Sequence, residues 1–312
     1  MLNLRQQKRK KTYYLETIQE FINEFLNLQT KETTRKNYEI AITKYVEFLN
    51  QETKNQAITE DNAETNIKLY RSYLQKSHRL ASSSIDNYTL RIQAFNSYLG
   101  FNTKIKKLNS KKNKSYKYLT IQEIEQLLQT VPQTTKNQDL QARNKAIILT
   151  LFTAGLRVSE LCNLTRNDLI EDDGKTYLLI NGKGRAEDER EKIAITTQLK
   201  EAINNYLELK EDTGKDKPLF TSIHDKPLDR KTVNKELKKI AAETDEIFNT
   251  NIKPRCSSHC FRHSLARYLL VDKKQPISLV KDVLRHSSIE TTAKYLTNSE
   301  EELTELRETI IL

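Results

Sequence analysis

Residues 257–298 read SSHCFRHSLARYLLVDKKQPISLVKDVLRHSSIETTAKYLTN and combine basic, imidazole and phenol side chains at helical spacing. His259 and Arg262 are three residues apart, so on a helix they share a face. This pair suits a phosphate, because arginine offers a planar fork to two oxygens and histidine exchanges a proton near neutral pH. His286 and Tyr295 follow, nine residues apart, with a short turn between them. The stretch predicts a helical region that meets a phosphate.

Two other interpretations fit parts of this stretch. Residues 276–298, taken alone, are typical of a helix-turn-helix that reads the major groove of DNA. A zinc site is also conceivable, with ligands drawn from Cys256, His259, Cys260 and His263. Zinc sites normally join two separated ligand pairs across a loop, however, and four ligands along one helix face do not readily close a tetrahedron.

Two candidate cations lie upstream of this stretch. Arg157 sits in TAGLRVSEL (153–161), after an apolar helix and a glycine. An arginine among leucines and valine is costly to bury unless it meets an anion, and the simplest anion is Glu160. Lys183 lies in NGKGR (181–185), between two predicted strands. A lysine at such a hairpin tip is usually exposed, but it can also reach into a groove and protonate a leaving oxygen.

Taken in order, these pieces resemble the tyrosine recombinase family, which includes the phage integrases and Xer proteins. TAGLRVSEL resembles its first arginine box, SSHCFRHSLA its HxxRH box, and LRHSSIETTAKY its final histidine and tyrosine box. The resemblance covers about 118–298. It implies a site-specific recombinase that forms a 3′-phosphotyrosine without cofactor or metal. The implied catalytic residues are Arg157, Lys183, His259, Arg262, His286 and the nucleophile Tyr295.

The chain departs from the family pattern at three places. Arg285 stands where the family usually has glycine, and Thr297 where close relatives often have histidine. The predicted hairpin carries an acidic insert, AEDE, which leaves Arg185 and Lys192 as other candidates for the role of Lys183. The resemblance further implies double-stranded DNA as partner, and a tetramer on two DNA sites held by the tail, residues 299–312.

The charge distribution favours a polyanionic partner. The chain has 312 residues, 52 basic and 42 acidic, for a net charge of +10. Residues 1–117 hold 22 of the basic and 11 of the acidic residues, so they carry the whole excess. A positive surface attracts nucleic acid, since each neutralised phosphate releases counterions. The chain has six glycines and neither GxGxxG nor GxxxxGK[ST], so no nucleotide is indicated.

The expected fold is mainly α with two domains, and the resemblance implies that these domains clamp DNA. An all-α DNA-binding domain spans 12–100 after a basic tail, 1–11, with helices at 14–28, 33–50, 65–77 and 83–99. Residues 101–117 are lysine-rich and predict a linker. The catalytic domain, 118–312, has a small antiparallel sheet with strands at 176–181 and 192–196. Its helices are expected at 121–131, 141–154, 197–210, 229–244, 260–271, 276–285, 289–296 and 299–311.

Composition also bears on location and on the competing functions. Three cysteines suit a reducing compartment, and no run approaches the roughly 18 apolar residues of a membrane span, so a cytoplasmic protein is expected. Two alternatives stay open. One is a relaxing type IB topoisomerase, which uses the same chemistry without sequence-specific exchange. The other is a non-catalytic regulator that uses 276–298 as a helix-turn-helix, which leaves the upstream cations without a shared purpose.

Overall fold

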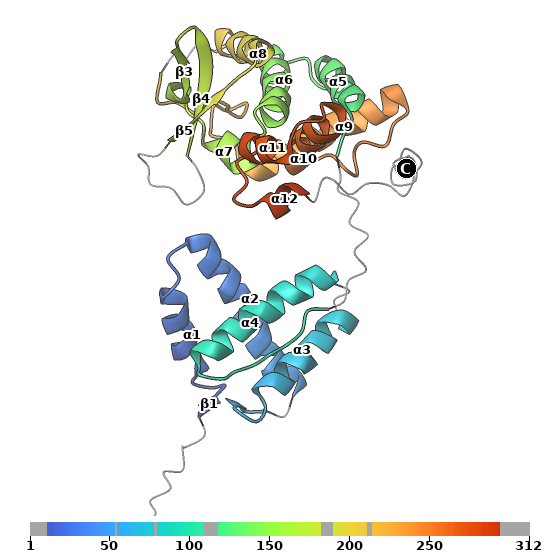
Figure 1. The fold of residues 1–312 in the computed structure, drawn as a ribbon. Helices are drawn as coiled ribbons and strands as arrows, with labels where there is room; N and C mark the ends of the chain where they lie inside the picture. Colours follow the sequence, from blue (N-terminus) through green and yellow to red (C-terminus); the bar gives the residue numbers. More distant parts are fainter. Residues whose placement is uncertain are drawn as a thin grey trace, which may run out of the picture. The chain divides into compact units, whose positions relative to one another are not determined.

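The computed structural model describes residues 11–53, 55–77, 80–108, 118–181, 190–210 and 214–293. The chain divides into two compact units, residues 1–113 and 114–312 (Figure 1). The predicted mainly helical fold is confirmed, with a two-stranded and a three-stranded sheet in the described residues. No helix in these ranges is both long and apolar enough to cross a membrane.

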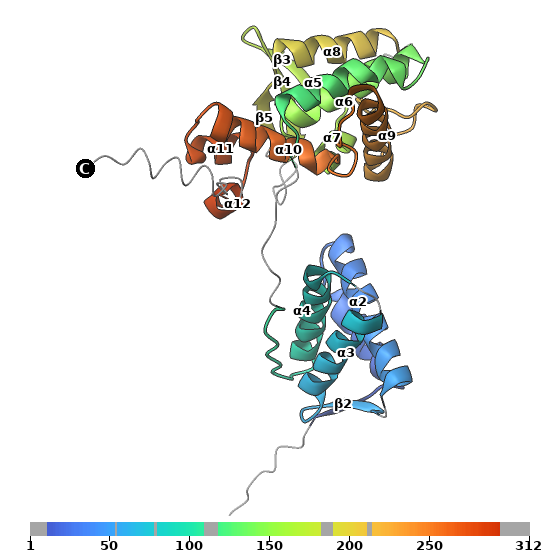
Figure 2. The same cartoon turned by 90° about the vertical axis from the view of Figure 1, so that its right-hand side faces the viewer.

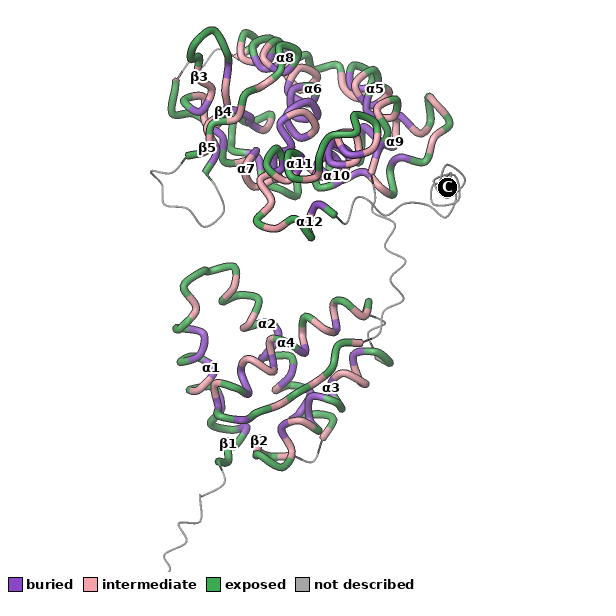
Figure 3. The backbone as a smooth tube through the Cα atoms, in the orientation of Figure 1, coloured by how far each residue is buried: buried purple, intermediate pink, exposed green. Residues whose placement is uncertain are grey.

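Amphipathic helices build the first unit. In the described residues these are α1 (Ile18–Asn27), α2 (Glu32–Glu52), α3 (Ala63–Ser77) and α4 (Ser82–Tyr98). On α1, Ile18, Ile22 and Phe25 repeat at helical spacing and are all buried. They pack with side chains of the other three helices in one core, which appears as the buried inner faces in Figure 3. Aromatic pairs such as Phe25 and Phe95 fill that core.

A short ribbon in this unit corrects the all-α expectation. β1 (Thr12–Tyr14) pairs antiparallel with β2 (Ala57–Thr59). Tyr14 therefore belongs to a strand, although it was predicted to open the first helix. Strands of three residues are too short to show the period-two alternation by which a strand is recognised in a sequence.

Residues 101–108 belong to the first unit, although 101–117 were expected to form a linker. Phe101 is 3% exposed and lies in the core of this unit. The segment then runs back along the helices: Gln93 donates to the Thr103 carbonyl at 3.0 Å, and Arg71 donates to the Lys106 carbonyl at 2.7 Å. The sequence did not predict that this segment packs on the helices, because it is rich in lysine and contains few apolar residues. Residues 109–117 lie outside the described residues.

The second unit surrounds one central apolar helix, α6 (Gln138–Thr153), which packs against α8 (Thr197–Glu208) and α10 (Ser258–Arg267). Helix α6 is buried on nearly all sides from Ala146 to Leu151. The other described helices are α5 (Ile121–Thr130), α7 (Val158–Asn163), α9 (Arg230–Phe248), α11 (Ile277–Val283) and α12 (Ile289–Ala293), with η1 (Val131–Gln133), η2 (Arg166–Asp168) and the π turn η3 (Tyr268–Asp272) between them.

Helix starts in this unit follow the capping residues. Thr120 accepts from the Glu123 amide while the Glu123 carboxylate accepts from the Thr120 amide, and these two bonds form a capping box at the start of α5. Asn137 caps α6, and Ser257 caps α10, each by a side-chain oxygen that accepts from a first-turn amide. The Ser257 cap fixes the start of the helix that carries His259 and Arg262.

A three-stranded antiparallel sheet completes the unit, in the order β3 (Leu169–Asp172), β4 (Lys175–Asn181) and β5 (Arg190–Ala194). The two predicted strands are β4 and β5, and β3 was missed because its LIED sequence has no alternation. Leu178 and Ile180 of β4 face the core. In register, Asn181 pairs with Arg190, so these residues bracket segment 182–189, which is outside the described residues.

Candidate active site

Arg157 stands at a sharp chain reversal between α6 and α7. The reversal is made at Gly155, whose φ is +58°. The left-handed backbone conformation favours glycine, and a Cβ added there would lie 2.9 Å from Leu265 Cδ2, so the leucine side chain would have to shift. Arg157 then takes the N-cap position of α7 in an extended conformation. Its side chain is one-third exposed and turns back over the helix start.

A buried carboxylate holds Arg157 in place. Glu160 Oε1 accepts from Arg157 Nη1 at 2.7 Å, and Glu160 Oε2 accepts from the Arg157 amide at 2.8 Å. Burial by itself raises the pKa of Glu160, but the charge of Arg285 and the hydrogen bonds from Arg157 outweigh it, so the pKa lies below its ordinary value. The ion pair expected from the sequence is therefore present, and it fixes the position of the Arg157 side chain.

Arg262 is the largest fully buried side chain among the described residues, with 1% exposure. It lies on α10, and its guanidinium donates to two backbone carbonyls. Nη1 bonds the Gly155 oxygen at 2.5 Å, and Nη2 bonds the Leu284 oxygen. Because these carbonyls belong to the chain reversal before Arg157 and to the turn before His286, Arg262 joins the segments that carry both residues.

The turn after α11 brings His286 to the arginines. The Arg285 amide donates to the Asp282 carbonyl at 2.9 Å, and the His286 amide donates to the Lys281 carbonyl at 3.0 Å. This is the paired C-terminal capping pattern that ends many helices. Arg157 Nη2 reaches the Arg285 carbonyl at 3.4 Å, so the turn supplies backbone acceptors to both arginines. In two perpendicular views, α12 lies beside α11 just beyond this turn (Figures 1 and 2).

The histidines of the site are neutral at pH 7. Burial, followed by the charges of Arg262 and Arg157, lowers the pKa of His286 to about 4. Burial and the neighbouring imidazole of His259 lower the pKa of His263 to about 4. The pKa of the more exposed His259 is lowered by the same kinds of cause. The His259 and His263 rings meet edge to face, with centroids 4.2 Å apart.

Two residues of this cluster, Thr292 and Arg285, were not predicted from the sequence to belong to the site. Thr292, with 0% exposure, places its hydroxyl 2.8 Å from His286 Nδ1. Arg285 Nη2 donates to Glu160 Oε2 at 2.9 Å, whereas Arg157 Nη1 donates to the other oxygen, Oε1. A threonine six residues after a histidine gives no signal in isolation. The substitution of arginine for the usual glycine was visible, but its partner 125 positions away was not.

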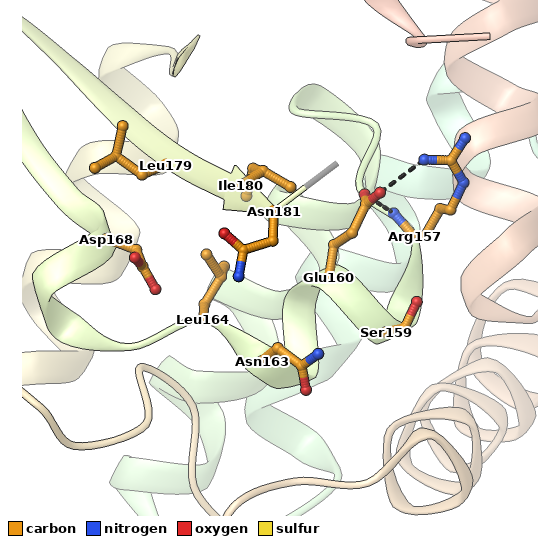
Figure 4. Close-up of a pocket in the computed structure, with 9 residues that line it drawn as sticks. All are labelled: Arg157, Ser159, Glu160, Asn163, Leu164, Asp168, Leu179, Ile180 and Asn181. Carbon is orange, nitrogen blue, oxygen red and sulfur yellow. Dashed lines mark hydrogen bonds and ion pairs between the residues drawn. The ribbon is translucent and has the colours of Figure 1, made fainter. Parts of the chain in front are cut away.

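An open pocket links Arg157 to the end of β4 (Figure 4). Arg157 and Glu160 lie on one side of it and Asp168 on the other, with Asn181 between them. The strand leads directly into the segment that contains Lys183. Lys183 and Tyr295 are both outside the described residues, so the structure brings together four of the six predicted site residues, namely Arg157, His259, Arg262 and His286.

The alternative interpretations can be compared with the same geometry. Lys192 Nζ is ion-paired to Asp172 and lies 4.1 Å from the centre of the Tyr177 ring, so its ammonium is engaged on the sheet. Of the residues in the zinc alternative, Cys256 and Cys260 are buried in the core, whereas His259 is exposed. Across the described ranges, no group of three or more histidine, cysteine or acidic side chains is arranged to hold a metal.

This arrangement can bind and polarise a phosphate group. Two fixed guanidinium groups and neutral imidazoles surround one turn, and the carboxylate among them is already neutralised by arginines. Such pre-organised donors stabilise charge that develops on oxygen in a transition state.

Comparisons with known proteins agree with this geometry. Over 194 residues the chain is 31% identical to the tyrosine recombinase XerD of Chlamydia trachomatis, covering 60% of this chain and 59% of XerD. It is 31% identical over 197 residues to XerA of Thermococcus onnurineus, covering 62% of each. The match thus spans less than two-thirds of the length of either relative.

Solved structures show the same fold over nearly the whole chain. The XerH site-specific recombinase in a post-cleavage complex with its palindromic difH substrate superposes with a TM-score of 0.72 and 19% identity, covering 95% of this chain and 84% of XerH. The Tn1549 transposon integrase with transposon right end DNA gives a TM-score of 0.68 and 16% identity, covering 93% and 98%. Residues 117–302, more than half of the chain, match the phage integrase family, and the chain belongs to that family.

Proposed function

We propose that this chain is a site-specific DNA recombinase, a strand transferase that cuts and rejoins DNA through a 3′-phosphotyrosine. The observation that carries the proposal is the convergence of Arg157, Arg262 and His286 on one turn, with His259 on the adjoining helix. A phosphodiester fits this set, because its non-bridging oxygens need cationic donors and no metal ligand is required. The 31% identical Xer recombinases support the same reaction class.

In the proposed reaction, the Tyr295 oxygen attacks the phosphorus of a DNA phosphodiester. The new O–P bond forms as the bond from phosphorus to the 5′ oxygen breaks, giving a 3′-phosphotyrosine and a free 5′-hydroxyl. An unperturbed tyrosine has a pKa near 10, so it needs a base and a cationic pocket. Neutral His259 accepts the phenol proton, while Arg157, Arg262 and His286 stabilise the charge on the pentacoordinate phosphorus.

The leaving 5′ oxygen needs a proton, and we assign its donor as Lys183. The pocket beside Arg157 extends to Asn181, two residues before this lysine. The other candidate on the sheet, Lys192, has its ammonium bound to Asp172. A substrate with a 5′-bridging phosphorothiolate supplies a better leaving group, so it should restore cleavage by Lys183→Ala. An absence of restoration would move the acid role to another group.

Covalent capture in cells tests the function. Wild type and Tyr295→Phe are expressed, the lysates are denatured, and DNA that remains attached to protein is sequenced. We expect a few sharp sites with wild type, with no attachment in the variant. Equal attachment by Tyr295→Phe would overturn the choice of nucleophile. Attachment scattered over the genome would favour the type IB topoisomerase alternative, and no attachment even with DNA from the neighbourhood of the gene would favour the non-catalytic regulator.

The remaining expectations concern partners and domains. We propose that residues 12–100 form the DNA-binding domain, that the two domains clamp double-stranded DNA, and that the protein works in the cytoplasm. The net +11 of residues 1–117 supports the DNA contact. We further propose that tail 299–312, which is outside the described residues, docks on a neighbouring protomer in a tetramer on two sites. Deletion of this tail should abolish tetramers on DNA, and an unchanged tetramer would refute the assignment.

A further inference from the structure

Arg285 occupies a backbone position that favours glycine. Its φ is +55°, and it directly follows the C-terminal residue Leu284 of the α11 cap. Helices that end in this hydrogen-bond pattern usually place glycine here, because a Cβ is strained in the left-handed region. The chain instead carries its bulkiest cationic side chain at this point.

The position of the Arg285 side chain is also energetically unfavourable. It is only 7% exposed. Nη2 donates to Glu160, but Nε and Nη1 are buried and have no hydrogen-bond partner among the described residues. Buried donors without partners are unfavourable, and so is the left-handed backbone. Local stability therefore does not explain this arginine, and positions that break local rules in this way are often functional.

The Arg285 side chain does contribute to the site through the charge balance around Glu160. The carboxylate is 7% exposed and lies 2.7 Å from Arg157. With only that partner, a buried Glu160 would cancel the charge of Arg157, one of the two guanidinium groups offered to a phosphate. Arg285 binds the second oxygen of Glu160 at 2.9 Å and returns one positive charge to the cluster. Its own backbone carbonyl also accepts from Arg157 Nη2.

We infer that Arg285 is a positioning residue of the phosphate site, which fixes Arg157 through Glu160 and keeps the site net positive. This inference rests on the proposed function and deepens it. Since Arg285 is covered, it acts on the phosphate through its neighbours and not by direct contact. It should therefore affect the rate of strand cleavage more than the affinity for DNA.

Three variants separate this role from a purely structural one. Arg285→Gly removes the guanidinium and relieves the backbone strain, while Arg285→Lys keeps both the charge and the strain but loses the planar fork. Lys274→Gly is the matched control, because Lys274 has a φ of +51° and is exposed. A structural role predicts that Arg285→Gly destabilises the protein. A positioning role predicts an equal or higher urea midpoint for Arg285→Gly together with lower activity.

The cleavage measurement uses a nicked duplex that contains a site recovered by covalent capture. At saturating DNA, Arg285→Gly should cleave about tenfold more slowly, the size of one lost charge-assisted hydrogen bond, with the dissociation constant of DNA unchanged. Arg285→Lys should be intermediate, and Lys274→Gly should equal wild type. Unchanged cleavage in Arg285→Gly, or a joint loss of stability and DNA affinity, would overturn the inference.

Binding of orthovanadate provides a second test of this role, for which the DNA target sequence need not be known. This anion is tetrahedral in solution and becomes trigonal bipyramidal, like a phosphoryl transition state, when an additional oxygen ligand coordinates it. Its dissociation constant is measured by titration calorimetry. We expect about tenfold weaker binding by Arg285→Gly and no change in Lys274→Gly. Arginine-dependent vanadate binding without any DNA capture would refute the recombinase function but keep Arg285 in an anion site. Equal vanadate affinity in wild type and Arg285→Gly would refute the role of Arg285 itself.

Discussion

Substitution of Thr292 by valine should slow DNA cleavage without unfolding the protein. The Thr292 hydroxyl is fully buried and lies 2.8 Å from His286 Nδ1. Because the pKa of His286 is lowered to about 4, its ring is neutral at pH 7 and carries one proton. We expect the hydroxyl to donate to Nδ1, which keeps this proton on Nε2, where it is available to a phosphate oxygen. Valine matches the shape of threonine but lacks this donor.

The size of the effect follows from the bond that is lost. One neutral hydrogen bond contributes about 0.5–1.5 kcal/mol, and each 1.36 kcal/mol changes a rate about tenfold. Thr292→Val should therefore cleave about 2–10-fold more slowly than wild type. Removal of a donor to a developing oxyanion costs about 10²–10³-fold, so His286→Ala should be slower by roughly that factor. Thr292→Ser keeps the hydroxyl and should retain a rate close to wild type.

Single-turnover cleavage of a nicked duplex at pH 7.5 and saturating protein measures these rates. Thr291→Val is the matched control, because it removes the hydroxyl of the preceding threonine, which pairs with Ser288 at 3.2 Å and not with the imidazole. Circular dichroism and the urea midpoint of each variant report the fold. The reasoning fails if Thr292→Val cleaves as fast as wild type, or if Thr291→Val is slowed to the same extent.

Three further predictions concern the cluster and the neighbouring sheet. Gly155→Ala should lower the free energy of unfolding by about 1–2 kcal/mol and slow cleavage, because it strains a φ of +58° and pushes against Leu265; an unchanged urea midpoint would contradict this. Since burial and neighbouring charges lower the pKa values of His263 and His286 from 6.5 to about 4, the folded state binds fewer protons than the unfolded state between these values. Stability should thus be complete above pH 6.5 and fall toward pH 4, and urea midpoints at pH 7.5 and 5 should differ less in His263→Gln. Lys192→Met should leave cleavage within about twofold of wild type, whereas a large loss would make Lys192 the proton donor.

Much of the fold could be predicted because its signals are local. Residues 121–131 were predicted to form a helix, and α5 begins at Ile121, directly after its N-cap residue Thr120. The nearly continuous apolar run of α6 predicts a buried helix, and α6 is central. The short strands β1 and β3 gave no such signal, since three or four residues show no period. The docking of 101–108 on the first unit depends on Phe101 and on backbone carbonyls, which the lysine-rich composition concealed.

In the candidate site, too, residues with a local sequence signal were predicted, whereas long-range contacts were not. Arg157, His259, Arg262 and His286 were identified because their boxes resemble a known family, and the fold brings them together. Glu160 entered the prediction only as a partner that competes for Arg157. Its second partner, Arg285, is 125 positions away, and helical spacing gives no information about a contact of that range.

The turn after α11 explains why the cluster depends on more than its side chains. Arg262 bonds the Leu284 carbonyl, and Arg157 reaches the Arg285 carbonyl, so both arginines take their positions from one stretch of backbone. Every residue type supplies a carbonyl, and no sequence motif records which carbonyl is used. A change that alters the conformation of this turn should therefore displace both arginines together, even where it leaves each of the proposed catalytic side chains intact. The left-handed conformation at position 285 is thus part of the phosphate site, whichever side chain stands there.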